Sequence, residues 1–167
     1  YWGRKIRTHD LRHLLDLKER PFSPMSSRVE GSLDLLPQEY PSYGSSDFRS
    51  PAFQIQLENG STIIDATYRS HRIVPGKPAL EGLPAAYVEN QDEADTLEIT
   101  LRDDLAGVQI ILAYTVFSTL DVITRSVRFL NAGTQSLKLW RCLSMSIDFT
   151  DCECDVLHLP GSWARER

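Results

Sequence analysis

Apolar and polar residues alternate along much of the chain after residue 52. In the first run, residues 53–58, an apolar residue is followed each time by a polar one. A period of two places every second side chain on the same face, so this run predicts a half-buried β-strand. Asn59-Gly60 follows at once and favours a tight turn that needs positive φ. We therefore predict a hairpin whose second strand spans residues 61–73.

Four later runs alternate in the same way and predict further strands, at residues 96–103, 108–117, 122–130 and 136–149. The run 108–117 is apolar on both faces, which is typical of a central, covered strand. In the run 122–130 we expect Ile123, Val127 and Phe129 to point inward. Turn-forming residues separate these runs, at residues 103–107 and 131–133. Prolines and glycines from Pro75 to Pro84 predict a rigid loop.

Long alternating strands joined by hairpin turns, with little helix, predict an all-β fold, a large antiparallel β-sandwich. The first part of the chain differs. Leucines at helical spacing predict a short helix near residues 10–17. The stretch 33–51 has no regular period but holds aromatic residues and leucines that favour burial, so we predict an ordered loop there. A long ordered loop in a compact domain is commonly functional.

Composition narrows the function classes. A chain of 167 residues with 41% hydrophobic residues is long enough for one domain with a core. Its net charge of −5 argues against a nucleic-acid partner, and no apolar run approaches the length of a membrane helix. Three cysteines and no recognisable signal peptide favour a reducing compartment, so we expect a cytoplasmic protein. Its opening, Tyr1-Trp2-Gly3, indicates a piece of a longer protein.

The sequence contains no strong metal-binding or catalytic motif. Cys142, Cys152, Cys154 and His158 are soft metal ligands, but their spacing does not match a structural zinc site, and half-buried thiols near a strand end are the alternative. The acids Asp148, Asp151, Glu153 and Asp155 cluster near one strand end, where solvated loop charge is the alternative to catalysis. No nucleophile elbow or phosphate-binding glycine loop is present. We therefore predict no metal site and no cofactor.

Aromatic and charged residues of the early loops offer a better candidate site. Sugar sites combine apolar walls with a few fixed polar groups. That mixture is supplied by Trp2, Phe22, Tyr40, Tyr43, Asp47, Phe48, Arg49 and Trp163. Packing in the core or between domains is the alternative for each aromatic residue.

Several segments together carry a resemblance to a known family. They are PQEYPSYGSSDFRSPA (37–52), SHRIVPGKPALEGLPA (70–85), DTLEITLRD (95–103), AYTVF and DVITRSVRFLN (within 113–131), LSMSIDF (143–149) and LHLPGSWARER (157–167). In this order they closely resemble the N-terminal domain of the bacterial and fungal α-galactosidases of glycoside hydrolase family thirty-six. The resemblance covers essentially the whole chain.

This resemblance implies a β-supersandwich that lacks the family's first strands and precedes a catalytic (β/α)₈ barrel and a C-terminal domain. In the family the barrel carries two aspartates of a retaining mechanism, so the chain itself is expected to be inactive. Members commonly form homotetramers, and a loop of one N-terminal domain reaches a neighbour's active site. The implied partners are therefore the chain's own barrel, neighbouring subunits and α-galactosides of the raffinose and melibiose type.

The same resemblance implies the substrate-binding candidates. The loop before Phe22 corresponds to the segment that reaches a neighbour, and its candidates are Glu19, Arg20 and Arg28. Glu19 stands where the family commonly has aspartate. Asp47 and Arg49 form a second pair, for which an internal salt bridge within the loop is the alternative. A free-standing carbohydrate-binding module with its own site around residues 40–49 is the other functional hypothesis.

Overall fold

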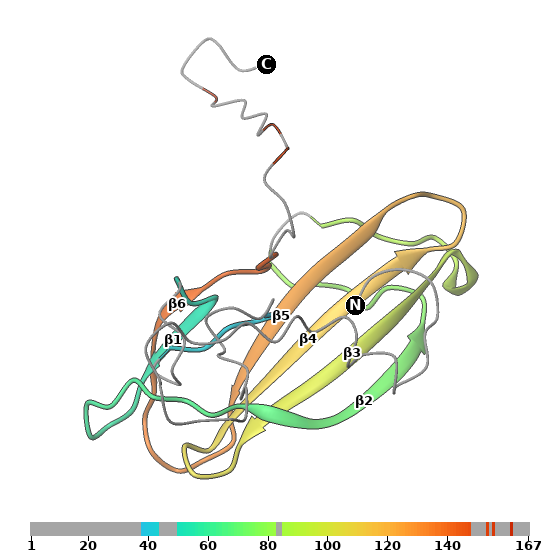
Figure 1. The fold of residues 1–167 in the computed structure, drawn as a ribbon. Coiled ribbons are helices and arrows are strands. Elements are labelled where there is room, and N and C mark those ends of the chain that lie inside the picture. The colour runs from blue at the N-terminus through green and yellow to red at the C-terminus, as the bar shows by residue number, and fades with distance from the viewer. Residues whose placement is uncertain are drawn as a thin grey trace, which may run out of the picture.

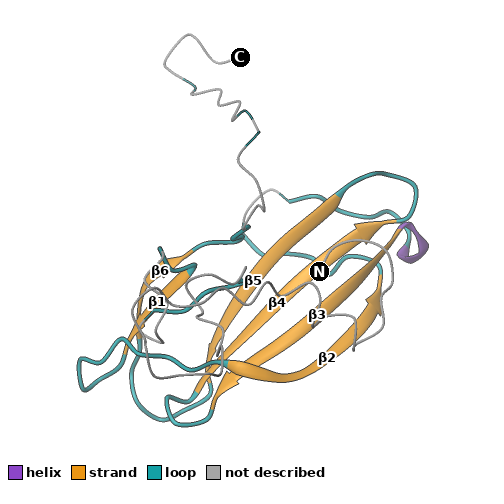
Figure 2. Ribbon diagram, in the orientation of Figure 1, coloured by secondary structure: helices purple, strands orange, loops and turns teal. Residues whose placement is uncertain are grey.

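The computed structural model describes residues 38–43, 50–82 and 85–147, together with residues 153, 155 and 161. Apart from one 3₁₀ turn, the regular structure of these residues is all strand (Figure 2). The elements are β1 (Phe53–Gln56), β2 (Thr67–Pro75), η3 (Gln91–Glu93), β3 (Ala94–Asp103), β4 (Val108–Phe117), β5 (Ile123–Asn131) and β6 (Lys138–Cys142).

The strands form two antiparallel sheets (Figure 1). The larger sheet has the order β2-β3-β4-β5, in which each strand pairs with the next one along the chain. The smaller sheet pairs β1 with β6, the first and last strands of the described residues. This arrangement confirms the predicted antiparallel β-sandwich. Each sheet contains one register shift, between Gln54 and Ile55 in β1 and between Tyr68 and Ser70 in β2.

The core lies between β1 and one face of the larger sheet. Phe53 of β1 is 1% exposed and stacks on Tyr40, with ring centroids 5.4 Å apart. Phe129 of β5 lies 5.7 Å from the Phe53 ring. Ile110, Leu112 and Tyr114 of β4 complete the centre of the cluster, and Ile55 and Ile64 extend it. Apolar burial of this kind is the main favourable term in folding.

Three of the predicted strands of the larger sheet agree closely with the structure, whereas β2 begins at Thr67 instead of residue 61. The strand predicted at 108–117 is β4, and it is central, with β3 and β5 as its neighbours. The strands predicted at 96–103 and 122–130 correspond to β3 and β5, with ends shifted by one or two residues. The predicted proline-rich loop between residues 75 and 85 contains no strand in its described part beyond Pro75, which ends β2.

The predicted hairpin at Asn59-Gly60 was wrong, although the turn itself is present. Gly60 has φ +84°, and its amide donates to the carbonyl oxygen of Leu57. The chain beyond residue 61 does not pair with β1, however. It runs to the larger sheet, where β2 pairs with β3, while β1 pairs with β6. The turn motif specified a local reversal, but burial of β1 against the larger sheet placed the returning strand elsewhere.

Two predictions of inward-facing residues also need correction. Ile123 was expected inward, but it is 53% exposed because the small sheet covers only part of the larger one. The strand predicted at 136–149 is shorter: β6 ends at Cys142, and residues 143–147 have no strand. Leu139, Met145 and Ile147 are about half exposed or more. The alternating pattern there marks apolar side chains that the described part of the chain leaves largely exposed.

The predicted turn between β3 and β4 is organised by Asp103. Its Oδ1 accepts hydrogen bonds from the amides of Leu105 and Ala106, each at 2.9 Å, and its Oδ2 accepts one from the Asp65 amide at 2.9 Å. The turn packs on the predicted turn after β5, where the amide of Ala132 donates to the carbonyl oxygen of Gly107. One buried carboxylate therefore fixes this turn and ties it to residue 65.

Gly107 provides a test of this turn packing. It has φ +66°, and an added Cβ would lie 2.6 Å from the Cα of Gly133. We expect Gly107→Ala to lower the free energy of unfolding by about 2–3 kcal/mol, combining left-handed strain with a backbone clash. Gly60 is the matched control, because it has φ +84° but open space around it. Gly60→Ala should cost only the strain, about 1 kcal/mol. Equal losses in urea titrations of the two variants would contradict the clash.

Other predictions fall outside the described residues. The helix predicted near residues 10–17 is one of them, as is most of the ordered loop predicted at 33–51. The described parts of that loop, residues 38–43 and 50–51, contain no helix or strand. In the described part of the chain, no helix has the length and apolarity to cross a membrane.

Candidate functional site

The five substrate-binding candidates all lie outside the described residues. They are Glu19, Arg20, Arg28, Asp47 and Arg49. Their roles therefore stay predictions. Of the aromatic candidates, the structure describes only Tyr40 and Tyr43. Tyr40 is buried in the core, which is the packing alternative for this residue, and Tyr43 is 46% exposed. Both lie just before residues 44–49, the segment that holds the second candidate pair.

The structure shows how the residues on either side of segment 44–49 are held. The amide of Ala52, after the segment, donates to the carbonyl oxygen of Pro41, before it, at 2.9 Å, which closes a loop from residue 41 to residue 52. The Tyr40 hydroxyl donates to the carbonyl oxygen of Leu143 at 2.5 Å, and the Leu143 amide donates to the carbonyl oxygen of Ala52 at 2.9 Å. The base of this loop is thus fixed to the core through Tyr40 and to the chain after β6.

Arg125 joins the same base to the larger sheet. Its side chain is 7% exposed, and Nη1 lies 3.0 Å from Oε1 of Glu39. The guanidinium carbon lies 5.3 Å from the ring centroid of Tyr40 and 4.9 Å from that of Tyr114, within cation–π range. The Tyr114 hydroxyl donates to Oε1 of Glu39 at 2.6 Å. Burial of a cation is costly unless it is paired, and here the carboxylate and two aromatic faces pair it.

The two tyrosines of this network stay neutral at physiological pH. Burial raises the pKa of Tyr40 well above its ordinary value, and the nearby Cys142 adds to the effect while Arg125 opposes it. Burial likewise raises the pKa of Tyr114, helped by the hydrogen bond to Glu39. Both phenols therefore act as hydrogen-bond donors, to a carbonyl and to a carboxylate.

Sequence reasoning missed Glu39 and Arg125, although a signal for Arg125 exists. Arg125 stands in phase with Val127 and Phe129, on the face of β5 that points to the core. A charged residue at an inward position of an apolar strand face indicates a buried, paired charge. Arg125 of β5 is paired directly opposite Tyr114 of β4, which explains their contact.

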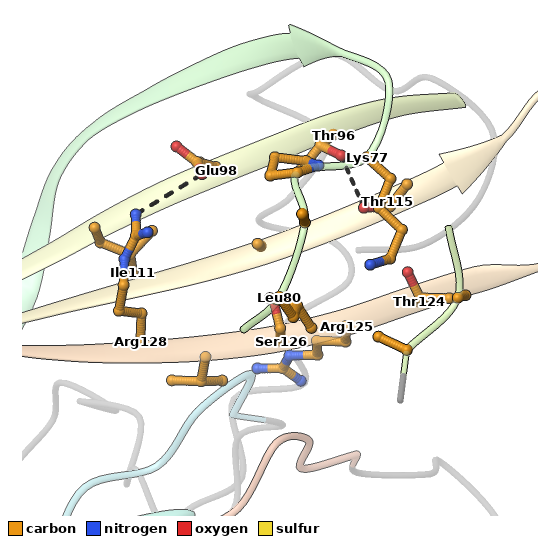
Figure 3. A pocket seen from close by; sticks show the side chains of 16 residues that line it. Lys77, Leu80, Thr96, Glu98, Ile111, Thr115, Thr124, Arg125, Ser126 and Arg128 are labelled. Carbon is orange, nitrogen blue, oxygen red and sulfur yellow. Dashed lines mark hydrogen bonds and ion pairs between the residues drawn. The ribbon is translucent and has the colours of Figure 1, made fainter. Parts of the chain in front are cut away.

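A cavity of about 330 Å³ lies on the other face of the larger sheet. Its floor comes from alternate residues of β3, β4 and β5, and the loop after β2 forms its opposite wall with Lys77 and Leu80 (Figure 3). Alternation along each strand brings these floor residues to one face. They are Thr96, Glu98, Ile111, Ala113, Thr115, Thr124, Ser126 and Arg128.

Hydrogen bonds and ion pairs fix the cavity floor. The Thr96 hydroxyl, which is fully buried, donates to the carbonyl oxygen of Gly76 at 2.7 Å and lies 2.8 Å from the Thr115 hydroxyl oxygen. Glu98 has a side chain only 9% exposed. Its Oε2 accepts from Nε of Arg72 at 2.5 Å, and its Oε1 lies 3.9 Å from Nη2 of Arg128. The carboxylate on β3 is therefore held between Arg72 of the neighbouring β2 and Arg128 of β5, which lies two strands away.

The candidate metal ligands and acids are only partly described. Cys142 is an exposed free thiol, whereas Cys152, Cys154 and His158 lie outside the described residues. Glu153 and Asp155 are exposed, and Asp148 and Asp151 are not described. Within the described ranges, no group of three or more His, Cys, Asp and Glu residues gathers as metal ligands would.

Comparison with known proteins now identifies the family. Residues 1–167 match the family described as "Glycosyl hydrolase family 36 N-terminal domain". The chain is 52% identical, over its whole length, to alpha-galactosidase AgaA of Geobacillus stearothermophilus. The chain belongs to the glycosyl hydrolase family 36 N-terminal domains. The predicted resemblance is thereby confirmed.

Other relatives support the same family assignment. The chain is 40% identical, again over its whole length, to the bifunctional alpha-galactosidase/sucrose kinase AgaSK of Mediterraneibacter gnavus. A crystal structure of a variant of Geobacillus stearothermophilus AgaA in complex with raffinose has a TM-score of 0.87 and 52% identity, and it covers the whole chain. The chain spans only 23% of the length of AgaA and 18% of the length of AgaSK.

Proposed function

We propose that this chain is the N-terminal, non-catalytic domain of a longer retaining α-galactosidase that hydrolyses terminal α-galactosides of the raffinose and melibiose type. The observation that carries the proposal is the end-to-end match to AgaA, at 52% identity and a TM-score of 0.87. AgaA is an alpha-galactosidase, and a variant of it was crystallised with raffinose. In this proposal the catalytic aspartates belong to a barrel that follows the domain, and the domain itself does no chemistry and needs no cofactor.

The first proposed role of the domain is to brace the barrel and to support assembly into a homotetramer. Exposed apolar side chains on the small sheet and just after it support this role. Leu139, Trp140, Met145 and Ile147 are each between 50% and 65% exposed. Clustered exposed apolar residues are typical of surfaces that another domain or subunit covers. Exposed Tyr68 and Ile73 on β2 extend the apolar surface available for such contacts.

The second proposed role is to lend loop residues to a neighbouring active site. Glu19, Arg20 and Arg28 are the first candidates, and Asp47 and Arg49 are the second. Support for the second pair comes from the fixed base of segment 44–49. Tyr40, Glu39 and Arg125 hold that base to the core, so the residues that flank the segment are anchored. A positioned loop can present charged groups to a sugar with little loss of conformational entropy.

The test is a kinetic comparison in the full-length protein. We expect raffinose hydrolysis by the wild type. Glu19→Ala should lower kcat/KM by about tenfold or more, because a charge-assisted hydrogen bond to a sugar hydroxyl is lost. Glu58→Ala is the matched control: Glu58 is an exposed acid beside the Gly60 turn, and its loss should leave kcat/KM unchanged.

Three outcomes would count against the proposal. A full-length protein without α-galactosidase activity would refute the proposed reaction. Normal kcat/KM in Glu19→Ala and Arg28→Ala would remove the lending of those loop residues while leaving the reaction intact. Saturable raffinose binding by the 167-residue chain, lost in Asp47→Ala, would instead favour a free-standing carbohydrate-binding module.

A cytoplasmic location is also proposed. The exposed free thiol of Cys142 supports it, because free thiols persist in reducing compartments.

A further inference from the structure

Three polar side chains without partners in the described residues converge on the cavity beside the loop after β2. The side chain of Lys77 reaches past Thr115 toward Thr124 (Figure 3). Thr124 and Ser126 are two residues apart on β5, so both hydroxyls face the cavity. Donors that are not paired within the protein can donate to a ligand with acceptor atoms. This end of the cavity therefore presents an ammonium group and two hydroxyls.

The charge of the cavity is positive, although the chain as a whole has a net charge of −5. Lys77 and Arg128 line it, and Glu98 is the acid on its floor. The Glu98 charge is already balanced by Arg72, which pairs with it from β2. Arg125 also borders the cavity, but its guanidinium pairs with Glu39 on the opposite face of the sheet. A surplus of positive charge therefore remains for an anion.

The other end of the cavity and its walls suit the hydroxyl-bearing ring of a sugar. Glu98 and Arg128 lie side by side at that end and offer an acceptor and a donor, the groups that bind sugar hydroxyls (Figure 3). Leu80 of the wall and Ile111 of the floor are apolar, and Ala113 is a small residue on the floor. A volume of about 330 Å³ is at the small end of the range for ligand sites. A ligand of monosaccharide size fits these dimensions.

From these features we infer that the cavity between the loop after β2 and the sheet is an accessory site for a small sugar anion, a hexose phosphate or a hexuronate. The oxyanion contacts Lys77, Thr124 and Ser126, and the hydroxyls of the sugar contact Glu98 and Arg128. None of the residues that line this cavity is among those proposed to reach a neighbouring active site. It would place a second class of ligand, charged sugars, on the domain.

The inference can be tested by calorimetric titration of the full-length protein with glucose 6-phosphate, glucuronate, inorganic phosphate and neutral glucose. We expect saturable binding of glucose 6-phosphate or glucuronate, and the stronger of the two identifies the oxyanion. Inorganic phosphate should bind more weakly, because it makes no contacts at the Glu98 end. Neutral glucose should not saturate. Binding should weaken as salt concentration rises, since exposed charges are screened.

Two kinds of variant locate the binding in this cavity. Lys77→Met removes the ammonium group and should weaken binding by about tenfold or more, whereas Lys77→Arg should retain most of it. Ala113→Leu fills the cavity without altering any charge and should abolish binding. Lys138→Met is the matched control, because it removes an exposed lysine of β6 that does not line the cavity. Circular dichroism spectra of all variants should match the wild type.

Three results would overturn the inference. One is the absence of binding of either sugar anion up to about 10 mM, an affinity too weak to count as a site. The second is binding that Lys77→Met and Ala113→Leu leave unchanged, which would place the ligand elsewhere. The third is equal affinity for neutral glucose, which would remove the anion from the proposal. None of these results depends on whether the protein hydrolyses raffinose.

Discussion

Phe53→Ala is expected to lower the free energy of unfolding by about 3–5 kcal/mol, the range for truncation of a fully buried aromatic residue. Phe53 is 1% exposed, stacks on Tyr40 and lies 5.7 Å from Phe129. Its removal leaves a cavity at the point where β1, the loop base and β5 meet. Urea unfolding followed by circular dichroism measures the loss.

The control for this variant is Leu105→Ala. Leu105 is also a large apolar residue, but it is 100% exposed in the turn after β3. Its truncation should change the free energy of unfolding by no more than about 0.5 kcal/mol. If Phe53→Ala cost as little as this control, the small sheet would not be packed on the core as described.

Arg125→Ala is expected to lower the free energy of unfolding by about 2–4 kcal/mol, because it removes a buried cation that contacts a carboxylate and two aromatic rings. Glu39, whose side chain is 47% exposed, can be solvated again after the change, which limits the loss. Arg125→Met should recover part of the stability by filling the space between the Tyr40 and Tyr114 rings. Glu39→Gln should cost about 1–2 kcal/mol, because the buried guanidinium then lacks its counter-charge.

A double-mutant cycle separates these contributions. Arg125→Met and Glu39→Gln together should cost less than the sum of the two single changes, because each removes the same ion pair. Arg128→Ala, on the same strand but with a side chain 59% exposed, is the matched control and should be near neutral. Strict additivity in the cycle would show that Glu39 and Arg125 do not stabilise each other.

The sequence predicted β3, β4 and β5 of the larger sheet well because these strands are local and strongly patterned. β3, β4 and β5 follow one another with short turns, and the turn between β3 and β4 holds two residues of defined preference, Asp103 and Gly107. In such a meander the neighbours in sequence are also the neighbours in space. Alternation and turn chemistry are then sufficient to specify the pairing.

The small sheet could not be predicted in the same way. β1 pairs with β6, so its partner lies far along the chain, and the Asn59-Gly60 turn beside it suggested a closer one. Alternation in residues 136–149 indicated apolar side chains. It could not distinguish side chains buried within this domain from side chains buried against another domain. Leu139 and Met145 are apolar and yet half exposed, which fits the second case.

For the site, sequence reasoning identified loops more readily than the residues that hold them. The prediction of an ordered loop at 33–51 rested on its aromatic residues, and Tyr40 is indeed a core residue. Glu39 and Arg125 are 86 residues apart, and no local pattern joins them. The cavity beside Lys77 arises from side chains on three strands and one loop, so it exists only once the sheet has formed.

β1 pairs with β6, far along the chain, and this pairing has a consequence for synthesis on the ribosome. The Tyr40 hydroxyl and its acceptor at Leu143 are 103 residues apart. At a translation rate of about 5–20 residues per second, the N-terminal partner waits roughly 5–20 s before the other emerges. The four-stranded meander, whose contacts are local, can form during that interval and bring the two ends closer. Phe53 and Tyr40 stay without their final cover until then, so in the nascent chain this stretch is the natural point of contact for chaperones.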